Sequence, residues 1–256
     1  MKKTISLVLS IFFLGFGIAH ATATSEVNSY IDWTTLAIQN GASAGLDWAS
    51  RYEASYTNAS NNLVTNSQNE QVLWNSATGV TSTNYVLNAT GHGYTSAGLV
   101  AADAISGADG IATTNAGASA SVHRRDFFTI SSDATLTFSV NYNFLQRIIA
   151  DDSSEGGSAY SFAEIWLLGP SGDFKDPIDH VSVELSNNVP SMTNYTTDGT
   201  LSVNGSFLAN NSYSIEAHLY SANSAYSPQK TVPEPATMLL LGVGLMGLAG
   251  VRRFKD

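Results

Sequence analysis

The stretch Ala134-Thr-Leu-Thr-Phe-Ser-Val-Asn-Tyr-Asn-Phe144 alternates without a break between apolar and polar residues. Its apolar members are Ala134, Leu136, Phe138, Val140, Tyr142 and Phe144. Successive side chains of a β-strand point to opposite faces, so this period of two predicts a strand with one face buried and the other in water. Antiparallel sheets show this pattern, whereas the strands of parallel sheets read as continuous apolar runs.

The segments beside this stretch also favour strands. Phe127, Phe128 and Ile130 predict a short strand before it, with a turn at 131–133 between the two. Residues 160–168 follow as a strand that we expect to be buried more completely, because Phe162, Ile165, Trp166 and Leu167 crowd into it.

The end of the body predicts a β-hairpin. Residues 200–209 and 212–221 are both strand-like, and Asn210-Asn211 between them tolerates the positive φ of a tight turn. Gly205 interrupts the first of these strands, which is typical of a β-bulge.

The first third of the body is less clear. Residues 30–38 predict a strand with Ile31 and Trp33 on one face. Residues 44–56 fit a short helix, with Trp48, Tyr52 and Tyr56 four residues apart, and fit a strand nearly as well. The remaining predictions are a loop at 58–69, a short buried run at 72–74, short strands at 85–87 and 99–100, turns at 91–93 and 107–110, and a strand of small residues at 116–122.

Many short strands separated by turns predict an all-β fold. We expect an antiparallel β-sandwich, jelly-roll-like, over residues 24–222, followed by a short polar linker at 223–231. The composition agrees, because charged residues are only 12% of the chain, about half the usual share. There is no cysteine, so stability must come from packing and not from disulfides.

The start of the chain predicts export. Lys2 and Lys3 precede an apolar stretch at 5–18, and small residues then provide cleavage sites after Ala21 or Ala23. Residues 1–23 are therefore expected to form a secretory signal peptide.

The end of the chain has three elements in a fixed order. Pro233, Glu234 and Pro235 are followed by an uncharged apolar run at 236–251 and then by Arg252 and Arg253. As a helix the run would extend about 24 Å, enough to span a thin bilayer with the basic residues on the cytoplasmic side. The prolines hold Glu234 in an extended segment before the membrane.

Residues 232–256 closely resemble the PEP-CTERM protein-sorting signal of Gram-negative bacteria. In this resemblance Pro233, Glu234 and Pro235 form the signature, 236–251 the membrane helix, and Arg252 and Arg253 the basic stop. It implies a precursor anchored in the inner membrane, recognition by a membrane-bound exosortase, and release to the cell surface or matrix in organisms that make exopolysaccharide. The plain alternative is a tail anchor with an incidental Pro-Glu-Pro.

The charge of the body limits its partners. Without the five basic and two acidic residues of the two ends, the chain keeps six basic and 19 acidic residues, a net charge of −13. Such a surface repels nucleic acid and anionic lipid, and suits neutral glycans, cationic surfaces, or anionic glycans only through a bridging cation.

No catalytic motif is present in the sequence. Glu164 shares a strand face with Trp166, but glycoside hydrolysis needs a second carboxylate, and the sequence shows none in a paired array. His92, His123, His180 and His218 lack metal-site spacing, and no serine lies in a nucleophile elbow. We therefore expect no enzyme activity, and a hydrolase would require two acids that face each other across a cleft.

Two further predictions concern ligands, the first of them calcium. Asp173, Asp176 and Asp179 recur every three residues, and a second acidic cluster consists of Asp151, Asp152 and Glu155. Either cluster could bind a structural calcium ion or be a solvated loop, and no other cofactor is expected.

Trp48, Trp74 and Trp166 are candidates for stacking on sugars, with core packing as the ordinary alternative. Two functions thus remain: a non-enzymatic surface or matrix protein associated with exopolysaccharide or biofilm, and a carbohydrate-binding β-sandwich.

Overall fold

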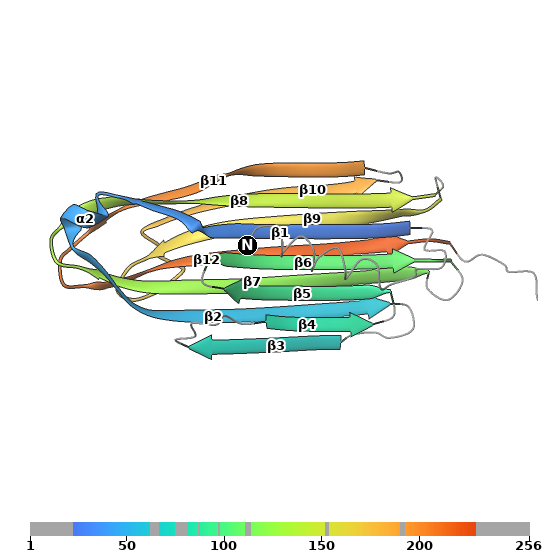
Figure 1. Ribbon diagram of the computed structural model, residues 1–256, viewed down its shortest axis with the longest axis horizontal. Coiled ribbons are helices and arrows are strands. Elements are labelled where there is room, and N and C mark those ends of the chain that lie inside the picture. Colours follow the sequence, from blue (N-terminus) through green and yellow to red (C-terminus); the bar gives the residue numbers. More distant parts are fainter. Residues whose placement is uncertain are drawn as a thin grey trace, which may run out of the picture.

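A computed structural model describes residues 23–61, 67–74, 81–86, 88–96, 98–110, 114–151, 154–189 and 193–228 (Figure 1). The predicted signal peptide, apart from Ala23, and the predicted sorting signal at 232–256 lie outside this part. No helix among the described residues has the length and apolar character needed to cross a membrane.

The described chain is all-β and forms two antiparallel six-stranded sheets. Sheet A has the order β11-β8-β1-β6-β5-β4, with β1 (Ala23–Gln39), β4 (Thr81–Val86), β5 (Ala89–Ser96), β6 (Leu99–Ala108), β8 (Ala134–Ala150) and β11 (Thr193–Phe207). Sheet B has the order β10-β9-β12-β7-β2-β3, with β2 (Leu46–Asn61), β3 (Ser67–Trp74), β7 (Asn115–Ile130), β9 (Gly156–Leu168), β10 (Asp179–Val189) and β12 (Ser212–Tyr226). One helical turn, α2 (Gly41–Ala44), joins β1 to β2.

The alternating stretch that begins at Ala134 is confirmed as a strand. In β8 the side chains of Leu136, Phe138, Val140 and Phe144 are fully buried, while Asn141 between them is exposed. Residues 30–38 lie in β1 with Ile31 and Trp33 buried, as predicted. Residues 44–56, which fitted two structures, belong mainly to the strand β2.

Several local predictions are wrong because strands run longer than their sequence signals. Gly91 to Gly93 is not a turn but the middle of β5, where residues 91 and 93 face the opposite sheet. Residues 58–61 and 67–69 are strand and not loop, and the two segments predicted around 116–122 and 127–130 are one strand, β7. β12 continues to Tyr226, into the segment expected to be a linker.

The predicted closing hairpin is also wrong. β11 pairs with β8 in sheet A, whereas β12 lies between β7 and β9 in sheet B, so the connection at 208–211 crosses between sheets. Asn210 does adopt positive φ, at 63°. Gly205 is not a bulge, since β11 stays in register with β8 throughout; a Cβ there would lie 2.6 Å from Ile178 Cγ2.

The core between the sheets differs from one end to the other. Near α2 it is aromatic, because Phe128 contacts the rings of Phe138, Phe207 and Tyr213. At the other end it is made of small residues, and a Cβ on Gly91 would lie 2.4 Å from the carbonyl oxygen of Ser119 in the opposite sheet. The sheets approach so closely there that only glycine fits.

Buried polar side chains join the sheets at this narrow end. Asn223 Nδ2 donates hydrogen bonds to the carbonyl oxygens of Ser25 and Ala104 in sheet A, at 2.6 and 2.7 Å. Ser221 Oγ donates to Ala102 O at 2.7 Å. Small apolar side chains contribute little hydrophobic burial, so these hydrogen bonds add specificity to the contact.

Candidate functional site

Strand β7 carries charged residues on both faces. Arg124 and Asp126 point into the sandwich, while the alternate residues His123 and Arg125 lie on the outer face of sheet B. Each pair belongs to a cluster of polar side chains, and the two clusters have different exposure and different partners.

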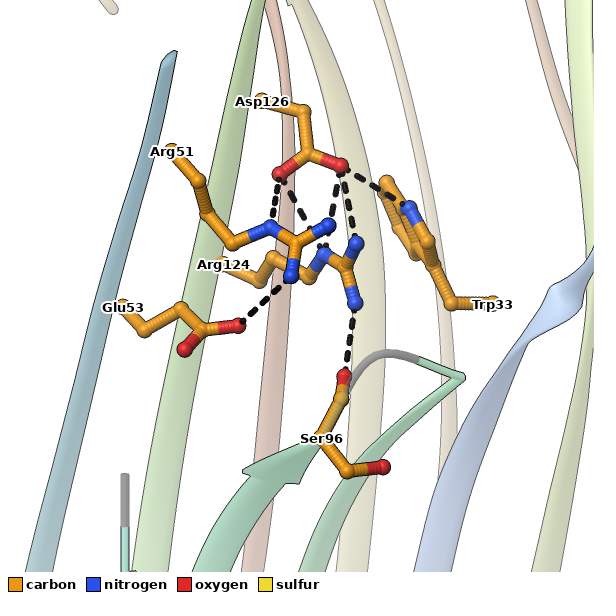
Figure 2. Close-up of polar contacts among 6 residues, drawn as sticks. All are labelled: Trp33, Arg51, Glu53, Ser96, Arg124 and Asp126. Atoms are coloured by element: carbon orange, nitrogen blue, oxygen red, sulfur yellow. Dashed lines mark hydrogen bonds and ion pairs between the residues drawn. The ribbon is translucent and has the colours of Figure 1, made fainter. Parts of the chain in front are cut away.

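The inner cluster is a closed network (Figure 2). Asp126 accepts hydrogen bonds from Arg124 Nη2 and Arg51 Nε, both at 3.0 Å, and from Trp33 Nε1 at 3.1 Å. The Arg124 guanidinium lies 4.8 Å over the Trp33 ring and donates to the Ser96 carbonyl at 2.8 Å. Arg51 also forms an ion pair with Glu53 at 3.7 Å.

Burial dominates the electrostatics of this inner cluster. Desolvation raises the pKa of Glu53, although Thr95, Arg51 and Arg124 lower it in part. Desolvation likewise lowers the pKa of the Arg124 guanidinium, and Asp126 offsets part of this effect. The Arg124 side chain is 1% exposed, so its charge is stable only because Asp126 and the Ser96 carbonyl solvate it. The cluster fixes the end of β5, where Ser96 lies, to sheet B.

The outer cluster is centred on Glu164 of β9. His180 Nε2 lies 2.9 Å from Glu164 Oε2, and His218 Nδ1 lies 2.9 Å from Glu164 Oε1. The neighbouring strands β10 and β12 supply these histidines, and the register of the sheet brings them beside the carboxylate. His180, Glu164 and His218 are far apart in the sequence, but together they form a His–Glu–His bridge across three neighbouring strands.

A second acid extends the outer cluster toward β7. Glu216 lies 3.4 Å from His123 Nδ1 and accepts a hydrogen bond from Arg125 Nε. The rings of His123 and His218 stack with centroids 4.0 Å apart and planes at 8°. The outer face of sheet B therefore carries three histidines, two glutamates and an arginine in continuous contact.

The pKa of Glu164 is lowered. Burial alone would raise it, but hydrogen bonds from His218, His180 and Trp166 outweigh the desolvation. This carboxylate is therefore held in its charged form, as an acceptor of hydrogen bonds.

Aromatic side chains border the outer cluster on both sides. Trp166 stacks on His180 with centroids 3.7 Å apart and meets Phe174 edge-on at 5.5 Å. A shallow depression of about 370 Å³ lies beside them and is lined by Tyr52, Tyr56, His123, Arg125, Phe174 and Glu216. Large aromatic rings thus flank charged hydrogen-bonding groups on an open sheet face.

The three tryptophans predicted to stack on sugars are not brought together. Trp166 lies on the outer face of sheet B and is half-buried. Trp48 is 41% exposed but contacts the core residue Phe128, with centroids 5.6 Å apart. Trp74 of β3 lies opposite Tyr52 of β2 in the strand register. The side chain of Trp74 lies outside the described part of the structure.

The acidic residues considered for calcium are engaged in local hydrogen bonds. Asp173 Oδ1 accepts from the Lys175 amide at 2.9 Å, and Asp179 accepts from the amides of His180 and Asn204. Asp176 is exposed. Of the second cluster, Asp152 lies outside the described residues. Glu155 is buried and bonds to the Asp151 amide and the Ser227 hydroxyl.

No group of three or more histidines or acids among the described residues has the arrangement of a metal site. Calcium binding therefore stays a prediction.

The sequence analysis missed most of the outer cluster. His123, His180 and His218 seemed scattered because their proximity depends on strand register and strand order. The available signal was the alternation of side chains along a strand, which places every second residue on the same face. It puts Glu216 and His218 on one face of β12. It likewise puts Glu164 and Trp166 on one face of β9.

Comparison with known families concerns the other functional region of the chain. Residues 231–253 match the family model of the PEP-CTERM protein-sorting motif. The chain carries a PEP-CTERM sorting signal. The matched span includes Pro233, Glu234, Pro235, Arg252 and Arg253, which the sequence predicted as its key residues. This motif is the signal that exosortase recognises, so the protein is exported and sorted through a membrane-anchored form to the cell surface.

No curated protein matches the chain.

Proposed function

We propose that this chain is a non-enzymatic protein of the cell surface or extracellular matrix of a Gram-negative bacterium, and that it binds exopolysaccharide through the outer face of sheet B. The PEP-CTERM motif supports the sorting step, which places the β-sandwich outside the cell. The observation that carries glycan binding is the Trp166–His180 stack beside the depression lined by Tyr52, Tyr56 and Phe174.

The chemistry of this face suits a glycan. Aromatic faces pack against the C–H faces of sugar rings, while a few fixed polar groups orient the hydroxyls. Glu164 and Glu216 offer acceptors, and His123 and Arg125 offer donors. The net charge of −13 outside the targeting segments favours neutral sugars over uronic acids.

The same groups favour binding over hydrolysis. A glycosidase needs a carboxylic acid whose pKa is raised, so that it can protonate the leaving oxygen. Glu164 has a lowered pKa, and Glu216 is engaged by Arg125 and His123. An assay for new reducing ends with purified exopolysaccharide would contradict a non-enzymatic role if it showed turnover.

Affinity electrophoresis in gels that contain the host's exopolysaccharide tests glycan binding. The secreted protein should be retarded, and Trp166→Ala should lose about 1.5–3 kcal/mol of binding free energy, or roughly 10- to 150-fold in affinity. Tyr30→Ala is the matched control, because Tyr30 is an exposed aromatic residue of sheet A. Equal retardation of the two variants would refute the proposed site.

The sorting step has its own test. The intact mass of the secreted protein should end near Pro233 to Pro235, and this species should disappear in a strain without exosortase. Retention of Arg252 to Asp256 in both strains would contradict processing of the tail.

A further inference from the structure

We propose that the glycan site on the outer face of sheet B extends along β9 to a second aromatic platform, made by Tyr160 and Tyr220, and that its ligand is a neutral glycan chain of several sugar units. The extension rests on the proposed glycan binding at Trp166, and adds a second subsite and the length of the ligand. Three features carry it: the spacing of side chains along β9, the tyrosine pair, and the acid beside this pair.

The outward side chains of β9 form one row on the outer face of sheet B, because every second side chain of a strand lies on the same face. The row consists of Tyr160, Phe162, Glu164 and Trp166, all of them half-buried. Trp166 lies six positions after Tyr160. At about 3.3 Å per residue the two rings are roughly 20 Å apart. A disaccharide is shorter than this distance, so a ligand that contacts both rings has several sugar units.

The second platform is a pair of tyrosines on neighbouring strands. Tyr160 of β9 and Tyr220 of β12 have ring centroids 5.9 Å apart and planes tilted by 58°. Tyr220 lies opposite Phe162 in the strand register, so three aromatic side chains adjoin on this part of the sheet. Neither tyrosine lines the depression beside Phe174. The pair is therefore a separate subsite, with apolar rings of the kind that pack against the C–H face of a sugar.

An exposed acid supplies hydrogen bonding at this platform. Tyr160 Oη donates to Glu184 Oε2 of β10 at 3.2 Å. Glu184 lies opposite Phe162 in the register and is exposed to solvent. An ionised carboxylate only accepts hydrogen bonds, so it suits the hydroxyls of a neutral sugar and repels the carboxylate of a uronic acid.

Polar groups also lie between the two platforms. Glu164 separates Phe162 from Trp166 in the row and contacts His218 Nδ1 at 2.9 Å. The His218 ring meets Phe162 edge-on, with centroids 5.9 Å apart. A glycan that follows β9 thus meets aromatic rings and hydrogen-bonding groups in turn, which matches the C–H faces and hydroxyls of successive sugar units.

Two platforms on one rigid sheet make affinity depend on the length of the ligand. A chain that reaches both makes its second contact within a complex that already exists, so this contact adds affinity without a second association step. A disaccharide occupies one platform only. Affinity should therefore rise with chain length until the ligand reaches from Trp166 to Tyr160, and then level off.

Isothermal titration calorimetry of the mature secreted protein tests the proposal, with a size series from disaccharide to octasaccharide prepared by partial hydrolysis of the host's exopolysaccharide. The wild type should bind the octasaccharide at least about tenfold more tightly than the disaccharide. Tyr160→Ala should remove most of this gain and change the affinity for the disaccharide by less than about twofold. Trp166→Ala should weaken the binding of both ligands.

Two control variants accompany the series. Tyr30→Ala removes an exposed tyrosine of sheet A and should bind every oligosaccharide like the wild type. Tyr160→Phe keeps the ring and removes only the hydroxyl that donates to Glu184, so it should keep most of the gain with length.

Cross-strand aromatic pairs also stabilise sheets, and urea denaturation measures that contribution separately. A Tyr160→Ala variant that loses stability but keeps the length dependence of the wild type would assign the pair to packing and overturn the second subsite. Equal affinity of the wild type for short and long fragments would also overturn it and leave the proposed function standing. A wild type that binds no fragment of any length would overturn both.

Discussion

Alternate residues of strand β7 contribute to two charge clusters, one buried between the sheets and one on the outer face of sheet B. The inner cluster around Arg124 and Asp126 lies between the sheets, where Asp126 accepts from Trp33 and Arg124, and Arg124 also donates to the Ser96 carbonyl. The outer cluster around Glu164 and Glu216 contains three histidines and lies on a face that is partly open to water.

This contrast supports our proposal that the inner charges are structural and the outer charges functional. An inward ion pair on β7 has to be neutralised by its own surroundings, and Arg51 and the Ser96 carbonyl contribute to this beside Arg124 and Asp126 themselves. Water alone could solvate the outward histidines and glutamates. These side chains nevertheless lie against large aromatic rings, which are usually buried away from water. Large aromatic side chains on an open sheet face support the proposed binding surface.

The largest effect is expected from breaking the inner cluster. Asp126→Ala removes the common acceptor of Arg124, Arg51 and Trp33 and leaves Arg124 buried without its counter-ion. The free energy of unfolding should fall by about 3–5 kcal/mol, as measured by urea denaturation followed by tryptophan fluorescence. A loss below about 1 kcal/mol would mean that water enters the cluster and solvates Arg124.

A smaller loss is expected in the outer cluster. Glu164→Gln removes the charge that His180 and His218 share, and should cost about 1–3 kcal/mol at neutral pH. Glu164→Gln should also change how the free energy of unfolding depends on pH. Because the pKa of Glu164 is lowered in the folded state, its stabilisation is complete above its unfolded pKa of about 4.3 and is lost as the pH falls through the folded pKa.

The wild type should therefore lose stability on acidification below about pH 4.3 more steeply than Glu164→Gln does. Urea midpoints measured at intervals from pH 6 down to pH 3 provide the comparison. Parallel pH profiles would show that Glu164 is not held by the two histidines in solution.

Phe174→Ala should affect binding and leave the fold intact. Phe174 is 41% exposed, contacts Trp166 and the Arg125 guanidinium, and lines the depression. Losing this wall should weaken glycan affinity by about 1 kcal/mol, or roughly fivefold, with no change in the urea midpoint. A large loss of stability with unchanged affinity would assign Phe174 to packing instead.

The smallest effect is expected on the outer face of sheet A. Thr137→Ala removes the hydrogen bond that Asn204 Nδ2 donates to Thr137 Oγ1 at 2.9 Å, between exposed side chains. The free energy of unfolding should change by less than about 0.5 kcal/mol, and glycan affinity should not change. This variant serves as the reference for both faces, and a clear loss of glycan binding would place the site on sheet A.

The sequence predicted the fold class because one property, alternation, is local. Leu136 to Phe144 show it plainly, and the tail around Pro233 is a contiguous motif that can be read directly. The hairpin at Asn210 was wrong because a turn residue indicates where the chain reverses and not which sheet receives the next strand.

The outer cluster was hidden for a related reason. Glu164, His218 and His123 meet only when β9, β12 and β7 lie side by side in a given register, and that order comes from long-range packing. The longer strands have a similar cause. Gly91 and Gly93 read as a turn locally, but the close approach of the opposite sheet requires residues without side chains at these positions in β5.

The most direct test of the proposed function is an NMR titration of the secreted protein with oligosaccharides prepared from the host's exopolysaccharide. The indole signal of Trp166 and the ring signals of His123, His180 and Tyr52 should shift together with one dissociation constant, while Tyr30, Ile105 and Leu145 of sheet A stay unchanged. Saturable shifts confined to sheet A, or no shifts at oligosaccharide concentrations that retard the protein in gels, would contradict glycan binding at the outer face of sheet B.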